Sequence, residues 1–202
     1  WFNRSCWLIG DIPRTGDYVS FESASRNGSY TVTYDENYTS SLIRLDVGYG
    51  PGGVAHFLIT NPAARIETGS MYVGASSADT GGGHGTVLQT AGFVQVNRAL
   101  DTSSWPAASW AGNLYLGLHA LDTGSYTLAG GTLSTGGTIV GYESVISDGD
   151  MPAFIHNSTT GVSSNAIHET GSLTVAFMPN SRGSYVLGAG MLASFDQTIG
   201  IA

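Results

Sequence analysis

Residues 111–141 read AGNLYLGLHALDTGSYTLAGGTLSTGGTIVG and contain one complete unit of a pattern that recurs along the chain. Leu114-Tyr115-Leu116 is a short apolar run that stops at Gly117. Ser125–Leu128 and Thr132–Ser134 are two further short runs, which stop before the glycine pairs at 130–131 and 136–137. Runs of three to five residues between glycines are too short for helices and are typical of strands. The unit therefore predicts three short strands.

The same three runs recur on both sides of this unit. Copies of the first run end at equivalent positions, Gly48, Gly74, Gly117, Gly141, Ala176 and Gly200, with a base period of about 24 residues and two insertions. The second run recurs as Phe57-x-Ile59, Val87-x-Gln89, Tyr126-x-Leu128, Phe154-x-His156 and Tyr185-x-Leu187. The third is anchored at Ile66, Val94, Leu133, Val162 and Leu192.

One such unit cannot bury its own apolar face, whereas stacked units bury a continuous column of like residues. Three short strands in fixed order favour an all-β fold, a right-handed parallel β-helix (β-solenoid) of about five to six coils. An antiparallel β-sandwich with Gly-rich turns is the alternative, because it also has short strands at regular spacing.

We divide the chain into two parts. Residues 1–41 form an atypical N-terminal capping segment or first coil, whose Trp1 and Trp7 could cover the open edge of the stack. Residues 42–202 contain the repeats, with loop insertions near 97–110 and at 142–150 and 163–170. The last residues begin another copy, so we expect this chain to be part of a longer, secreted precursor.

Composition excludes several classes of function. Glycine accounts for 29 of 202 residues, about twice ordinary usage, and only 11% of residues are charged. The seven cations are all arginine and the net charge is −8, so a nucleic-acid partner is not expected. No apolar run is long enough to span a bilayer. The single cysteine, Cys6, excludes an internal disulfide.

The repeats resemble a known family. The opening Trp1-x5-Trp7-x4-Ile12-Pro13, the run Tyr30–Thr33 and the LYLG and GSYTLAGGTLS repeats resemble the secreted β-solenoid proteins of the PEP-CTERM and autotransporter-associated-repeat type. The resemblance implies an extracellular or cell-surface passenger region without an assigned active site.

No catalytic, cofactor-binding or metal-binding constellation is found in the sequence. The five histidines show no metal-ligand spacing, and no serine stands in a Gly-x-Ser-x-Gly elbow. The carboxylates fall mostly in turns, where capping explains them. We therefore do not expect an enzyme, although a polysaccharide-degrading enzyme remains the third hypothesis because such enzymes use two carboxylates facing one groove.

Our leading hypothesis is an extracellular structural protein that forms a filament, sheath or matrix by strand-mediated self-association. The residues predicted to carry assembly are Trp1, Trp7, Thr198, Ile199 and Ile201. The alternative is a cell-surface adhesin or glycan-binding passenger, in which Trp105 and Trp110 on the first insertion would contact an extracellular glycan or another partner.

Overall fold

A computed structural model describes residues 12–22, 28–35, 39–76, 82–97, 112–143, 151–156 and 166–200. Within these ranges the structure is all-β and contains no helix. The strands are β1 (Tyr18–Glu22), β2 (Ser29–Tyr34), β3 (Thr39–Tyr49), β4 (Val54–Ile59), β5 (Arg65–Ala75), β6 (His84–Gln89), β7 (Phe93–Val96), β8 (Asn113–Leu116), β9 (Thr123–Leu128), β10 (Thr132–Val140), β11 (Ala153–His156), β12 (Ile167–Val175), β13 (Ser184–Leu187) and β14 (Met191–Ile199).

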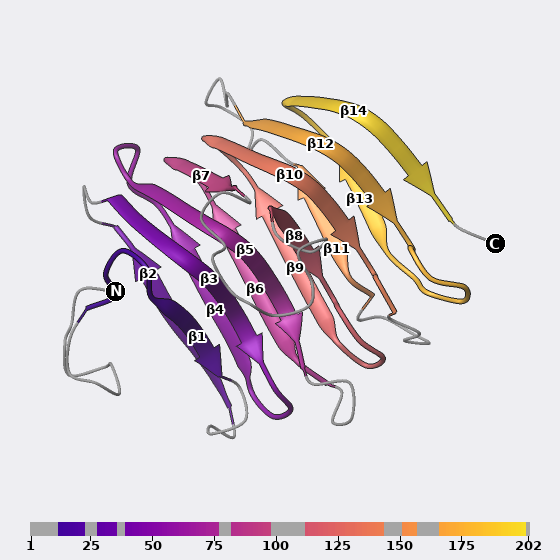
Figure 1. The fold of residues 1–202 in the computed structure, drawn as a ribbon, viewed down its shortest axis with the longest axis horizontal. Coiled ribbons are helices and arrows are strands. Elements are labelled where there is room, and N and C mark those ends of the chain that lie inside the picture. Colours follow the sequence, from indigo (N-terminus) through magenta and orange to yellow (C-terminus); the bar gives the residue numbers. More distant parts are fainter. Residues whose placement is uncertain are drawn as a thin grey trace.

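The strands form two parallel sheets. Successive strands along the chain alternate between them, except that β7 and β8 both belong to the first sheet. The first sheet, here called the long-strand sheet, has the order β1-β3-β5-β7-β10-β12-β14, with β8 between β5 and β10. The second, the short-strand sheet, has the order β2-β4-β6-β9-β11-β13. All pairs between named strands are parallel, which excludes the antiparallel alternative for the described residues. Figure 1 shows the strands following one another in sequence order along the long axis.

The expected three strands per repeat are only partly separate in the structure. In β5, the third predicted run (Ile66) and the next first run (Met71–Gly74) belong to one strand of 11 residues. The same two runs are joined in β10 and β12 but are divided between β7 and β8. Glycines such as Gly136 and Gly171 stand between the two runs, so the chain can bend there while the strand continues.

The six equivalent run-ending positions all have a left-handed backbone. Their φ angles lie between 59° and 75°, and five of the six are glycine. A side chain at such a corner is strained, and at Gly74 a Cβ atom would lie 1.9 Å from the carbonyl oxygen of Thr123. The chain leaves the long-strand sheet at these corners, which explains why glycine ends the first run.

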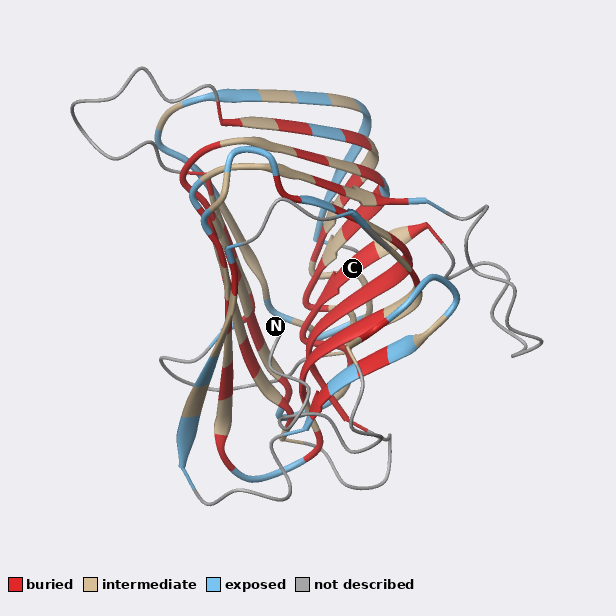
Figure 2. Cartoon of the chain, turned by 90° about the vertical axis from the view of Figure 1, so that its left-hand side faces the viewer, coloured by how far each residue is buried: buried red, intermediate tan, exposed pale blue. Residues whose placement is uncertain are grey.

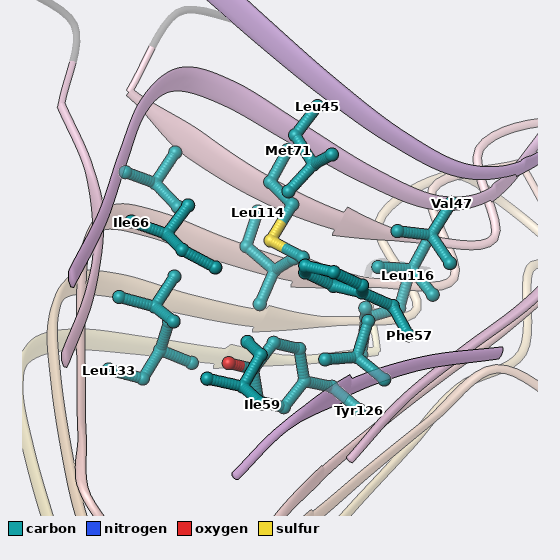
Figure 3. Packing of buried hydrophobic residues seen from close by; sticks show 14 of the residues in the cluster. Leu45, Val47, Phe57, Ile59, Ile66, Met71, Leu114, Leu116, Tyr126 and Leu133 are labelled. Carbon is teal, nitrogen blue, oxygen red and sulfur yellow. The ribbon is translucent and has the colours of Figure 1, made fainter. Parts of the chain in front are cut away.

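The core lies between the inward faces of the two sheets. The second-run residues are in register as predicted, with Phe57, Val87, Tyr126, Phe154 and Tyr185 in one row. Figure 2 shows the buried positions alternating with partly exposed ones along the strands. Figure 3 shows Phe57, Ile59 and Tyr126 packed toward aliphatic side chains from the other sheet.

One position of the third run was assigned wrongly. The register places His168, not Val162, between Leu133 and Leu192. Val162 lies outside the described residues. The insertion near 97–110 and the first part of the second insertion, 142–150, also lie largely outside them. Residues 167–170, from the second part of that insertion (163–170), belong to β12. The division at residue 41 falls inside β3, and the assignment of two parts stays a prediction.

Candidate functional site

The last strand of each sheet exposes side chains that are buried in other repeats. β13 pairs with β11 and β14 pairs with β12, and each stands at the end of its sheet. In the described part of the chain, five of the eight large hydrophobic side chains that are exposed belong to these two strands: Val186, Leu187, Met191, Phe195 and Ile199. We call β13 and β14 the terminal pair.

Two of these side chains occupy inward positions. Leu187 is in register with His156, which is fully buried, yet Leu187 is 50% exposed. Ile199 is in register with Val175, which is 6% exposed, and is itself 77% exposed. The terminal pair therefore presents a cross-section of the core to its surroundings.

Phe195 marks the bend of β14. Its neighbours in the register, Ser194 and Asp196, stand opposite Thr170 and Ser172, so Phe195 takes the place that Gly171 has in β12. Its side chain is 94% exposed. It adds to the other exposed apolar side chains of the terminal pair, and exposed apolar patches are a feature of interaction surfaces.

The opposite ends of the two sheets are β1 and β2. Val19 and Phe21 of β1 are almost fully buried, and the ring of Phe21 packs against that of Phe57 at 5.3 Å between centroids. In β2, the inward residues Tyr30 and Val32 are partly buried and pack against the core. In the described residues, β1 and β2 each have a strand partner on one side.

Only two of the residues predicted for assembly are among those that the structure describes. Thr198 and Ile199 lie in β14, where they pair with Thr174 and Val175, and only Ile199 points inward. Trp1, Trp7 and Ile201 lie outside the described residues, as do Trp105 and Trp110. The exposed Leu187 and Phe195 were missed, because alternation of apolar residues identifies inward positions but not which of them lack a covering strand.

An aromatic stack inside the core leads to the terminal pair. Tyr126 and Phe154 stack with ring centroids 5.4 Å apart, and Phe154 and Tyr185 stack at 4.8 Å. The ring of His168 also stacks on Phe154, at 4.6 Å. Stacked rings add to the stabilisation from buried area. The stack reaches β13, where Tyr185 is only partly buried.

Two buried histidines lie beneath the terminal pair. The ring nitrogens of His168 are 3.0 Å from Thr138 Oγ1 and 3.0 Å from the Tyr185 hydroxyl. His156 Nε2 is 2.9 Å from the carbonyl oxygen of Ala166, and its Nδ1 has no hydrogen-bond partner among the residues that the structure describes. Burial lowers the pKa of His168 to about 3 and also lowers the pKa of His156. Both rings are therefore neutral near pH 7.

A second aromatic row lies on the outward side of the long-strand sheet. Tyr72 stacks on Tyr115 with centroids 5.1 Å apart, Tyr142 meets Tyr115 edge-on at 6.2 Å, and Tyr142 stacks on Phe177 at 4.9 Å. Tyr72 and Tyr115 are almost fully buried. Tyr72 is contacted by the Tyr115 ring and by the Arg44 guanidinium, which lies 4.1 Å from its ring centroid, so these two buried tyrosines are not arranged to stack on a flat ligand.

Polar groups at the corners serve the fold. The fully buried Asp122 carboxylate accepts hydrogen bonds from Ser76 Oγ at 2.6 Å, Gly83 N at 2.8 Å and His119 N at 2.9 Å. Within the described ranges, no group of three or more His, Cys, Asp or Glu side chains could hold a metal ion. The enzyme and adhesin hypotheses stay predictions.

No protein-family model, curated protein or solved structure matches this chain. The resemblance to secreted β-solenoid repeats consequently stays an expectation from the repeats themselves. In the part of the chain that the structure describes, no helix has the length and hydropathy needed to cross a membrane.

Proposed function

We propose that this chain is a right-handed parallel β-solenoid and that it serves as an extracellular structural protein, which assembles end to end into a filament, sheath or matrix. The solenoid interpretation is supported by the alternation of strands between two sheets, in which each strand pairs in parallel with a strand two or three places further along the chain. Right-handed connections are strongly preferred between parallel strands of one sheet. The extracellular location is inferred from the repeat resemblance.

The observation that carries the assembly proposal is the exposure of the terminal pair. Leu187 and Ile199 continue inward rows whose other members are buried, so a further pair of strands would complete their packing. Backbone groups at a sheet edge also favour addition of another strand. Both effects act on the same surface.

A second copy of the chain offers strands suited to this surface. β1 and β2 stand at the other ends of the long-strand and short-strand sheets, so a copy added in the same orientation would extend both sheets in parallel. Their inward residues, including Phe21 and Val32, belong to the same core column. A head-to-tail contact of this kind repeats without closing and generates a filament.

The test compares two inward positions of the terminal pair with an outward position whose exposure matches that of Leu187. We expect Leu187→Asp combined with Ile199→Asp to prevent assembly, because a carboxylate would be buried without a partner at each joint. Met191→Asp is the matched control, since Met191 lies in the same strand as Ile199 and is 49% exposed, compared with 50% for Leu187. Its register partner Ile167 is only partly buried, so it points outward.

The readouts are sedimentation velocity and electron microscopy of the protein isolated without denaturant. Filaments from wild type and Met191→Asp, together with single rods from the double variant, would support the proposal. Filaments from the double variant would overturn it, as would single rods from wild type at all concentrations. Fractionation of the source cells tests the location separately.

A further inference from the structure

We infer that the outward face of the short-strand sheet is a lateral interface at which two copies of this chain pack side by side. This inference does not rest on end-to-end assembly, because it concerns a different surface. The face is built by β2, β4, β6, β9, β11 and β13, which lie next to one another in the sheet and along the long axis (Figure 1).

The outward positions of these strands contain no charged residue. They alternate with the buried positions and are partly or fully exposed. They are Ser29, Thr31 and Thr33; Val54, His56 and Leu58; His84, Thr86 and Leu88; Thr123, Ser125 and Thr127; Ala153 and Ile155; and Ser184 and Val186.

The long-strand sheet is different. Its outward side has Arg44, Asp46, Arg65, Glu67, Glu169 and Asp196. In a chain of net charge −8, an uncharged face of six strands is where a second negative copy can approach with least repulsion. Charge depletion is also a mark of interface cores.

The polar groups of this face are partly satisfied within it. His56 lies between two hydroxyl groups, with Nδ1 2.6 Å from Thr86 Oγ1 and Nε2 2.7 Å from Ser29 Oγ. His84 Nδ1 contacts Thr123 Oγ1 in the same way. These contacts join neighbouring strands and reduce the desolvation cost of covering the polar side chains.

The chemistry of the face favours a second copy over a glycan. Its outward positions include aliphatic side chains, among them Leu58, Leu88 and Ile155, but no Trp, Tyr or Phe ring on which a sugar could stack. Six strands about 4.8 Å apart, each about five residues long at about 3.4 Å per residue, give the face dimensions of about 29 Å by 17 Å. Two copies packed face to face would therefore bury roughly 1,000 Å² together. This is near the lower limit for a specific interface, so we expect a weak, reversible dimer.

The experiment measures self-association in the Leu187→Asp/Ile199→Asp background, in which end-to-end joints are blocked. Sedimentation equilibrium of this variant should fit a monomer–dimer equilibrium. Adding Leu88→Glu, near the centre of the face, should weaken the dimer at least ten-fold. Adding Thr132→Glu instead is the matched control, because Thr132 is partly exposed on the outward side of the long-strand sheet in a central strand.

Salt provides a second readout. Raising the NaCl concentration should tighten the dimer or leave it unchanged, because screening reduces the repulsion between two negative copies and the face has no ion pair to lose. If Leu88→Glu lowers the unfolding temperature markedly, Leu58→Thr with Leu88→Thr replaces it and should weaken the dimer several-fold.

A strictly monomeric protein at every concentration would overturn the inference. Equal loss of association in Leu88→Glu and Thr132→Glu would overturn it as well. Binding to insoluble neutral polysaccharide that Leu88→Glu abolishes, without any dimer, would assign the face to a glycan and also contradict the proposed occupant. None of these outcomes depends on whether filaments form.

Discussion

β4 in the interior of the stack and β13 at its end have the same alternation of inward and outward side chains, but their inward side chains are buried to different extents. In β4, Phe57 and Ile59 are fully buried, with β2 on one side and β6 on the other. In β13, Tyr185 and Leu187 occupy the equivalent rows, yet Leu187 is half exposed. Leu187 therefore lacks the cover that Ile59 has, whereas Val19 and Phe21 at the other end of the stack are buried. We expect the terminal pair to be the less stable part of the described structure.

The largest expected effect tests this difference within the aromatic stack. Phe154→Ala should lower the free energy of unfolding by about 3–5 kcal/mol, because it leaves a cavity between Tyr126 and Tyr185. Tyr185→Ala should cost only about 1–2 kcal/mol, since the side chain is partly exposed and loses packing on one side. Urea denaturation of both variants gives the comparison, and equal losses would show that the terminal pair is as well packed as the interior.

A smaller effect is expected at two corners with the same backbone conformation. Gly74→Ala should cost about 2–4 kcal/mol, because the left-handed backbone disfavours a side chain and the Cβ atom would overlap Thr123. At Gly200, where φ is 68°, nothing lies within 4 Å of the added atom, so Gly200→Ala should cost about 1 kcal/mol from the backbone alone. Thermal unfolding distinguishes the two, and a cost at Gly200 as large as at Gly74 would contradict the open corner.

The smallest effect concerns the cover that the terminal pair provides for His168. Burial lowers its pKa to about 3, below the value near 6.5 of an unfolded chain, so the folded state favours the neutral ring. This preference for the neutral ring of His168 has no destabilising effect above about pH 6.5. As the pH falls from there toward 3, the unfolded state gains a proton that the folded state does not, so the free energy of unfolding decreases. The loss should reach about 2 kcal/mol at pH 5.

Urea denaturation from about pH 7.5 to about pH 5 measures this dependence. His168→Gln, which cannot become charged, should flatten the profile. His56→Gln is the control, because His56 is partly exposed on the outward side of the short-strand sheet. An unchanged profile in His168→Gln would mean that His168 is not protected by Tyr185 and β14.

The repeats could be placed from the sequence to a considerable extent. The rows through Phe57, Tyr126 and Phe154 and the corners from Gly48 to Gly200 agree with the register and the φ angles. The prediction failed at Val162, since His168 holds that position. An apolar residue was preferred there, and hydropathy does not show that hydroxyl groups of Thr138 and Tyr185 satisfy a buried imidazole.

The candidate site was harder to predict. Ile199 was identified from the sequence as part of an incomplete repeat, but Leu187 and Phe195 were not, and the uncharged outward face was not recognised. Each requires knowledge of which strands are neighbours. Residues 84–89, for example, lie beside residues 123–128 across a gap in sequence that contains other strands.

The sequence by itself determined which side chains point inward and where the chain turns. Alternation in a strand has a period of two, and a left-handed corner favours glycine, so both are local properties. Only the tertiary structure decided which inward side chains are covered and which outward ones form a continuous face. Those depend on strand neighbours far apart in the chain, and therefore on how the sheets are ordered in space.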